Sequence, residues 1–173
     1  LFKSQGKDIS KIKGCIGADP IGTLARNGEI EDGLDNLMEQ MAKTIKWANE
    51  NAPSLKTILI QGHPYHDAGA SAIQELAFAL STGIFYIKNM LNRELTIDEI
   101  ASQIKFSFSI GTNFFMEISK IRAARSLWAQ IISAFGGNEE AQKMTIHGRT
   151  SSYTKTVYDP YVNMLRTTTE SFS

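Results

Sequence analysis

Two of the chain's three histidines, His63 and His66, lie in the segment 62–70, with Tyr65 between them. A phenol next to an imidazole could hold a substrate carbonyl and transfer or withhold a proton, because histidine changes charge near neutral pH. The alternative is structural, with both histidines bonded to backbone groups of a loop and capping the helix that follows. The residue types alone leave both interpretations open.

The third histidine, His147, lies two residues before Arg149. In an extended segment, residues two apart face the same way, so the two side chains could meet one carboxylate or phosphate. Arginine would bind such a group with a planar pair of N–H donors. The alternative is a surface arginine beside a histidine that stabilises a loop.

Other polar residues indicate less chemistry. Lys120, Arg122 and Arg125 form a basic cluster on a predicted helix, which we interpret as a solvated helix face. No combination of His, Cys and carboxylates has the spacing of a metal site. No glycine-rich nucleotide loop and no serine nucleophile elbow occurs in the sequence. The two histidine-containing segments therefore remain the candidate sites.

Composition limits the class of protein. Lysine plus arginine and aspartate plus glutamate balance at 18 each, which favours neither nucleic acid nor a membrane surface as a partner. No apolar run approaches the roughly 20 residues that span a bilayer. The single cysteine, Cys15, can form no internal disulfide, which favours a reducing, cytoplasmic setting. Neither end carries a start or stop signal, so we expect a fragment of a longer protein.

The hydrophobic pattern predicts the strands and helices that must position these residues. Apolar residues recur every three or four positions in the helices, and a capping box of Thr96 and Glu99 opens a short one. Asp19 and Pro20 are interpreted as a turn, and Asp159 as the N-cap of the last helix. We predict strands at 12–18, 55–61, 106–110 and 144–147. We predict helices at 31–51, 67–91, 97–103, 114–135 and from 160, with a polar loop at 148–158.

This alternation of strands and helices predicts an α/β fold with a mainly parallel sheet and right-handed crossovers. Four (β/α) units make about half of a TIM-type (β/α)₈ barrel, and we predict that residues 1–173 are a fragment of one such barrel domain. An open doubly wound sheet is the alternative. In a barrel, His66 and His147 should lie at the same end of the sheet, at the carboxyl ends of their strands.

Three blocks of sequence resemble the coenzyme A-binding barrel of methylmalonyl-CoA mutase. They are PYHDAGA (64–70) with QELA (74–77), GTNFFME (111–117) with KIRAARSLWA (120–129), and HGRTS (147–151) with DPY (159–161) and NMLRTT (163–168). The blocks follow the family's order and cover residues 55–173. The resemblance implies a (β/α)₈ barrel and interconversion of (R)-methylmalonyl-CoA and succinyl-CoA, with adenosylcobalamin supplying the radical.

The same resemblance implies site residues. Tyr65 and His66 match a pair that flanks the substrate in the family's catalytic chains, and His147 and Arg149 match a His-x-Gln pair in the last loop. Two departures stand out. The catalytic chains have two more residues between the Tyr-His pair and the Ala-Gly-Ala helix start, and Arg149 replaces the expected Gln. A longer, charged side chain would alter or obstruct that pocket.

Both departures resemble the small, non-catalytic subunit that pairs with a catalytic chain in many bacterial enzymes of this family. We therefore expect a small-subunit fragment that stabilises the catalytic subunit of a heterodimer, binds no cofactor itself and leaves the acyl-CoA substrate to its partner. The alternative is a fragment of a catalytic chain, with Tyr65, His66 and His147 in the acyl-CoA pocket. An unrelated barrel hydrolase or lyase is a third possibility.

Overall fold

The computed structural model describes residue 6 and residues 8–172, and the core of this part is a four-stranded parallel sheet. Its strands are β1 (Gly14–Ala18), β2 (Leu55–Gln61), β3 (Ile104–Ile110) and β4 (Ile146–Thr150). They pair in the order β1-β2-β3-β4, so each strand lies beside the next one in the chain. A doubly wound sheet reverses this order at a switch point, whereas a (β/α)₈ barrel keeps it. The α/β fold with the strand order of half a barrel is therefore confirmed.

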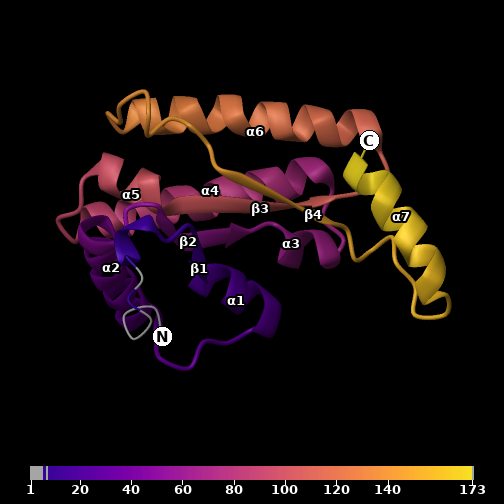
Figure 1. Ribbon diagram of the computed structural model, residues 1–173, viewed down its shortest axis with the longest axis horizontal. Coiled ribbons are helices and arrows are strands. Elements are labelled where there is room, and N and C mark those ends of the chain that lie inside the picture. The colour runs from indigo at the N-terminus through magenta and orange to yellow at the C-terminus, as the bar shows by residue number, and fades with distance from the viewer. Residues whose placement is uncertain (1–5, 7, 173) are drawn as a thin grey trace.

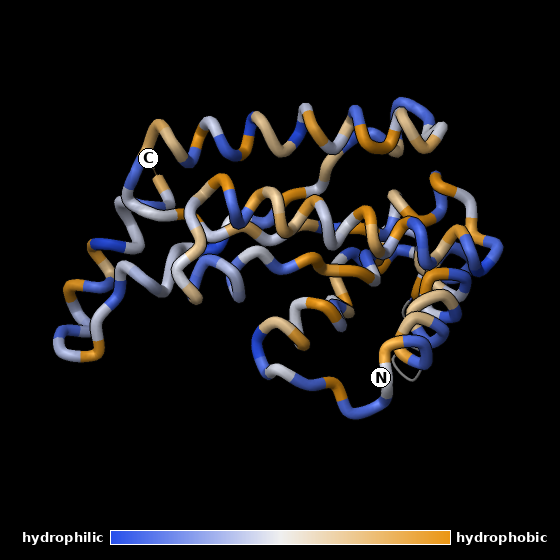
Figure 2. Tube along the Cα trace, turned by 180° about the vertical axis from the view of Figure 1, so that it is seen from behind, coloured by the Kyte–Doolittle hydropathy of each residue, from blue (hydrophilic) through white to orange (hydrophobic). Residues whose placement is uncertain are grey.

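Helices connect the strands, as the parallel pairing requires (Figure 1). They are the 3₁₀ helix η2 (Ile9–Lys11) and the α-helices α1 (Pro20–Asn27), α2 (Leu34–Asn51), α3 (His63–Asp67), α4 (Ala72–Leu91), α5 (Ile97–Gln103), α6 (Phe114–Ala134) and α7 (Pro160–Phe172). Hydrophobic and hydrophilic positions alternate along α6, the long helix at the top of Figure 2. Such a helix buries one face and leaves the other in water.

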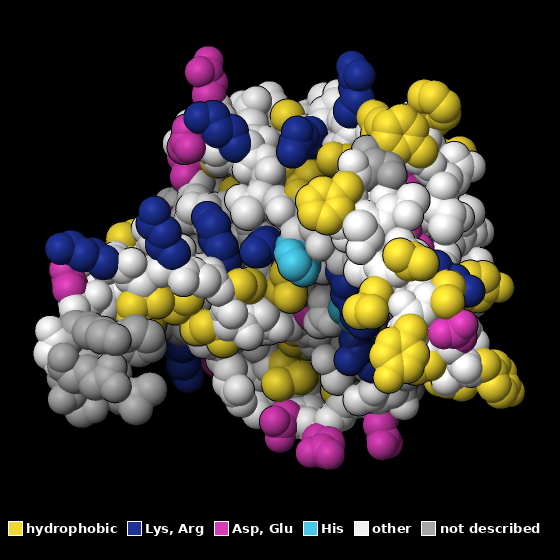
Figure 3. Space-filling model, turned by 45° about the vertical axis from the view of Figure 1, so that its right-hand side comes forward, with side chains coloured by type: hydrophobic (Ala, Val, Ile, Leu, Met, Phe, Trp, Pro, Cys, Tyr) yellow, Lys and Arg dark blue, Asp and Glu magenta, His cyan; other side chains and the backbone are white. Residues whose placement is uncertain are grey.

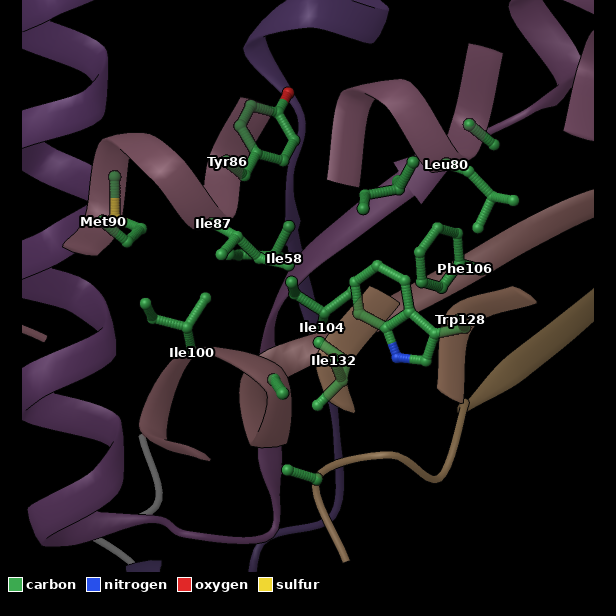
Figure 4. Close-up of a cluster of buried hydrophobic side chains, with 14 of the residues drawn as sticks. Ile58, Leu80, Tyr86, Ile87, Met90, Ile100, Ile104, Phe106, Trp128 and Ile132 are labelled. Atoms are coloured by element: carbon green, nitrogen blue, oxygen red, sulfur yellow. The ribbon is translucent and has the colours of Figure 1, made fainter. Parts of the chain in front are cut away.

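The core lies between the sheet and the helices α2, α4, α5 and α6 (Figure 4). Ile58 of β2 and Phe106 of β3 point to this side, where the Trp128 ring of α6 meets Phe106 edge to face at 4.8 Å. Gly83 of α4 is needed at this contact, because a Cβ atom there would lie 2.9 Å from the Trp128 ring. The helices are thus fixed on the sheet by close aromatic packing.

The opposite face of the sheet carries polar side chains. Strand residues alternate between the two faces, so the neighbours of the core residues point away from the helices. Ser107 pairs with His147 and Ser109 with Arg149, which places these side chains together on the face that would line the inside of a closed barrel. This surface is called the polar face below.

Several predicted elements are confirmed. The strand at 55–61 has the predicted bounds, and the capping box is formed by Thr96 Oγ1, which accepts from the Glu99 N–H at 3.3 Å, and by Glu99 Oε2, which accepts from the Thr96 N–H at 2.8 Å. Asp159 Oδ1 accepts from the Val162 N–H at 3.2 Å at the start of α7, as an N-cap does.

Other predictions of local structure are wrong. The strand predicted at 144–147 runs from Ile146 to Thr150, because the polar residues assigned to a loop pair with β3. Asp19 and Pro20 are not an isolated turn but the N-cap and first residue of α1. The helix predicted from 67 begins at Ala72, behind a capping box of Ser71 and Gln74, and the short helix α3 precedes it.

Candidate functional site

The carboxyl ends of β2, β3 and β4 surround a cavity of about 450 Å³, and this is the candidate site. Its lining comes from the α3–α4 connection, the β3–α6 connection and the segment after β4, including His66, Ser71, Thr112, Asn113, Ser151 and Tyr153. Active sites of parallel α/β proteins lie at this end of the sheet.

His66 joins two sides of this cavity. Its Nε2 atom lies 2.7 Å from Ser151 Oγ, and its ring faces the edge of Tyr153 with 6.4 Å between ring centroids. Beside it, Ser152 Oγ donates to Asp67 Oδ1 at 2.5 Å. The segment after β4 is thereby tied to α3, and the imidazole is held in one orientation at the cavity wall.

Tyr65 points elsewhere, although it is the sequence neighbour of His66. Its hydroxyl lies 3.3 Å from Thr82 Oγ1, and its ring packs against Phe78 at 5.2 Å between centroids. Both contacts are with α4. In this structure the phenol and the imidazole therefore do not converge on one cavity.

His147 does not follow its strand but lies within it. It is the second residue of β4, opposite Ser107, and the strand continues to Thr150. The prediction that His66 and His147 share the carboxyl end of the sheet is therefore wrong for His147. Together with Arg149, it lies exposed on the polar face.

His63 has partners that the sequence did not indicate. Its side chain is buried, with 9% of the residue exposed, and its Nε2 atom lies 2.7 Å from Arg26 Nη2. Arg26 also donates to Gln61 Oε1 at 3.2 Å. Burial, aided by the positive charges of Arg149 and Arg26, lowers the pKa of His63 to about 4. Arg26 belongs to α1, so the contact was missed together with that helix.

Asp19 ties the carboxyl ends of β1 and β2 to α4. Its carboxylate accepts from the Gly22 N–H at 3.0 Å, from the Gln61 N–H at 2.9 Å and from the Tyr86 hydroxyl at 2.5 Å. Burial raises the pKa of the Asp19 carboxyl, and burial together with the neighbouring Asp19 raises the pKa of Tyr86. The signal in the sequence was Asp before Pro, which is typical of an N-cap followed by the first helical residue.

A buried ionic group fixes the other side of the candidate site. Lys120 Nζ lies 2.8 Å from Glu75 Oε2 and 2.6 Å from Glu117 Oε2, and it donates to the Ser109 carbonyl at 2.5 Å. Glu75 Oε1 accepts from the Ser109 N–H at 2.8 Å. The side chain of Lys120 is 1% exposed, so its assignment to a solvated face is wrong, whereas Arg122 and Arg125 are exposed as expected.

A second, larger cavity lies between α6 and α7. Its volume is about 720 Å³, and its apolar lining includes Phe114, Ile118, Ile121 and Leu165. Within residue 6 and residues 8–172, no group of three or more His, Cys, Asp and Glu side chains could hold a metal ion. Over the same described residues, no helix has the length and apolar character needed to cross a membrane.

Comparison with known proteins gives one consistent result. A family model described as "Methylmalonyl-CoA mutase" matches residues 1–173. A methylmalonyl-CoA mutase small subunit from Streptomyces virginiae is 36% identical over 97% of this chain and 26% of its own length. A small subunit from Porphyromonas gingivalis is 38% identical over 99% of this chain and 27% of its own length.

Relatives without a subunit designation match equally well. The methylmalonyl-CoA mutase of Escherichia coli is 36% identical over 99% of this chain and 24% of its own length. The chain thus spans about a quarter of the length of the curated relatives it matches. Overall identity is similar for small subunits and for the other chains. The choice between them therefore depends on the residues of the site.

Proposed function

The chain belongs to the methylmalonyl-CoA mutase family, and from this premise we propose that it is part of the enzyme's small subunit. The whole enzyme would interconvert methylmalonyl-CoA and succinyl-CoA with adenosylcobalamin, in the cytoplasm. The small subunit would pair with the catalytic subunit in a heterodimer and stabilise it. Relatives designated small and large subunit both occur in Porphyromonas gingivalis, at 38% and 36% identity, which supports a two-subunit enzyme.

The position of Arg149 carries the small-subunit proposal. Its guanidinium projects from β4 onto the polar face, near enough to His63 to lower the pKa of that imidazole. The family resemblance implies an uncharged Gln at this place, on the side of the sheet that would face an acyl group. A guanidinium is larger, always charged and difficult to desolvate beside a thioester. Tyr65, bonded to Thr82, adds support because it does not line the His66 cavity.

One observation favours the alternative, a catalytic chain. His66 and Ser151 line a cavity at the carboxyl ends of the strands, where barrel enzymes hold their substrates. In that case Tyr65, His66 and His147 would belong to the acyl-CoA pocket, and Tyr65 would have to leave Thr82. The need for this rearrangement makes the small subunit the better-supported function.

We do not propose that these residues bind the cofactor. His63 and His66 use Nε2 for Arg26 and Ser151, and we assign neither of them as a cobalt ligand. Adenosylcobalamin would supply the radical elsewhere in the whole enzyme. The contribution proposed for residues 1–173 is half of the barrel domain of the small subunit.

Complex formation tests the proposed function. The complete parent chain is mixed with the catalytic mutase subunit of the same organism and examined by size-exclusion chromatography with light scattering. We expect a one-to-one complex, a raised unfolding temperature of the catalytic subunit and no turnover by the parent chain alone. Turnover of methylmalonyl-CoA by the parent chain alone would refute the small-subunit proposal.

A further inference from the structure

The apolar side chains of α7 face the solvent. Four of them lie on one side of the helix and are 64–88% exposed, namely Tyr161, Met164, Leu165 and Phe172. Figure 3 shows hydrophobic side chains gathered at the right of its view, the side of the molecule on which Figure 1 places α7. These four residues are called the apolar stripe below. An amphipathic helix normally turns such a stripe towards the protein, and α7 does the reverse.

Polar contacts hold α7 in this orientation. Glu170 is 6% exposed, accepts from Thr154 Oγ1 at 2.5 Å and forms an ion pair with Lys155. Asn163 Oδ1 accepts from the Thr156 N–H at 3.1 Å. The helix therefore cannot turn its apolar stripe inward without separating a largely buried ion pair, which is costly. The stripe needs a partner from outside the described residues.

The apolar stripe continues into the cavity of about 720 Å³ between α6 and α7. Leu165 belongs to the stripe and also lines this cavity, together with Phe114, Ile118 and Ile121 of α6. Stripe and cavity thus form one apolar surface over two helices. A contiguous exposed apolar surface of this kind marks a place of contact with another segment or protein.

The outer edge of β4 lies beside this surface, since α7 contacts β4. At the two ends of β4, the Thr145 carbonyl and the Ser151 N–H form hydrogen bonds with β3 at 2.9 and 2.8 Å. Successive strand residues direct their backbone groups to opposite edges, so the N–H groups of Gly148 and Thr150 point away from β3. No other described strand pairs with this edge. An unpaired edge is a template for a further strand.

We propose that the outer edge of β4 and the apolar stripe of α7 receive the strand and helix that follow residue 173 in the parent chain. The strand pairs in parallel with β4, and apolar side chains of the two elements cover the stripe. The described strands pair in chain order, so the next strand takes the place beside β4. The chain spans about a quarter of the length of its curated relatives, which leaves sequence for these elements in a parent chain of similar length. The inference rests on the barrel of the proposed function and not on the choice of subunit.

Photo-crosslinking of the complete parent chain identifies what covers the stripe. Tyr161→p-benzoylphenylalanine places a reactive ketone on the stripe, and the cross-linked peptides of the monomeric chain are identified by mass spectrometry. We expect an intramolecular link to the roughly 30 residues after position 173, the length of one strand–helix unit. Links only to a second copy, links only to an added catalytic subunit, or no link at all would each overturn the proposal.

Amide hydrogen exchange of the monomeric parent chain tests the pairing of β4. The N–H groups of Gly148 and Thr150 should exchange slowly, as groups in a sheet interior do. Leu165→Asp should accelerate their exchange by about tenfold or more, because it places a charge in an apolar contact. Leu127→Asp is the matched control at a 41% exposed position of α6 and should change it by no more than about twofold.

Rapid exchange of Gly148 and Thr150 in the wild-type parent chain would contradict the pairing, whether or not the variants fold. Equal acceleration by Leu165→Asp and Leu127→Asp would contradict the role of the stripe. The small-subunit assignment fails by a different result, turnover by the parent chain alone, which neither measurement detects.

Discussion

At the scale of single residues, Lys120 matters because it neutralises two carboxylates in the interior. Glu75 is fully buried and Glu117 is 12% exposed at the side chain, and Lys120 contacts both. A buried ion pair adds little net stability by itself, but an unpaired buried charge is costly. The energetic importance of Lys120 therefore lies in what its loss would leave behind.

We predict that Lys120→Met lowers the free energy of unfolding by about 3–5 kcal/mol, the usual effect of removing one partner of a buried ion pair. Urea unfolding measures it. Arg125→Met on the same helix is the control and should have an effect of no more than about 0.5 kcal/mol, because Arg125 is exposed. If both variants were equally stable, the ionic group would not hold α4 and α6 to β3.

The burial of Lys120 could have been predicted from its spacing. Lys120, Ala124 and Trp128 are four residues apart, lie on one side of α6 and are all buried. Arg122 and Arg125 fall on other sides. What the sequence could not show is the partner Glu75, which is 45 residues away in the chain and reaches Lys120 only in the folded state.

The lowered pKa of His63 makes the stability of the fold depend on pH. Its pKa is lowered from 6.5 to about 4 in the folded state, so between these values the unfolded chain binds the additional proton. Stability from this residue is fully present above pH 6.5 and is lost as the pH falls towards 4, with a slope of at most about 1.4 kcal/mol per pH unit.

The variant His63→Gln isolates this contribution. The difference in unfolding free energy between wild type and variant should shrink or reverse as the pH falls from 6.5 to 4. His147→Gln serves as the control, since it makes the same substitution at an exposed position of β4. A wild-type profile that matches that of His63→Gln over this range would show that His63 titrates normally.

At the scale of elements, the close approach of α4 to β3 and α6 depends on Gly83. A Cβ atom at this position would lie 2.9 Å from the Trp128 ring and 3.3 Å from Phe106. We predict that Gly83→Ala destabilises the fold by about 1–3 kcal/mol, as overpacking of a core does, although alanine favours a helix more than glycine. Thermal unfolding of this variant is compared with Ser81→Ala, an exposed change on the same helix that should be nearly neutral. Gain of stability in Gly83→Ala would contradict the packing described.

The elements differ in how far their sequences define them. Strand β2 and helix α5 carry local signals, an apolar run and a capping box, and their bounds were predicted closely. Strand β4 has the polar sequence IHGRT and forms a strand because it pairs with the edge of β3 that β2 leaves free. Helix α1 has only eight residues, and its N-cap residue Asp19 accepts hydrogen bonds from Gln61 and Tyr86. A local sequence pattern does not indicate such long-range contacts.

At the scale of the whole molecule, the sheet order and the polar face support the proposed barrel. Strands β1 and β4 are the outer strands of the sheet, and a (β/α)₈ barrel closes only when eight strands pair. The order of elements and the three family blocks were enough to predict this fold. The contacts at the candidate site were not predictable, because His66 and Ser151 lie 85 residues apart in sequence.

The central claim is that this chain stabilises a catalytic subunit and does not bind the substrate itself. Titration of the complete parent chain with succinyl-CoA tests this claim most directly. Calorimetry in the absence of the catalytic subunit should show no saturable binding of succinyl-CoA. Saturable binding of succinyl-CoA by the parent chain alone, with an affinity reduced in His66→Ala, would contradict the account and assign the chain to the catalytic subunit.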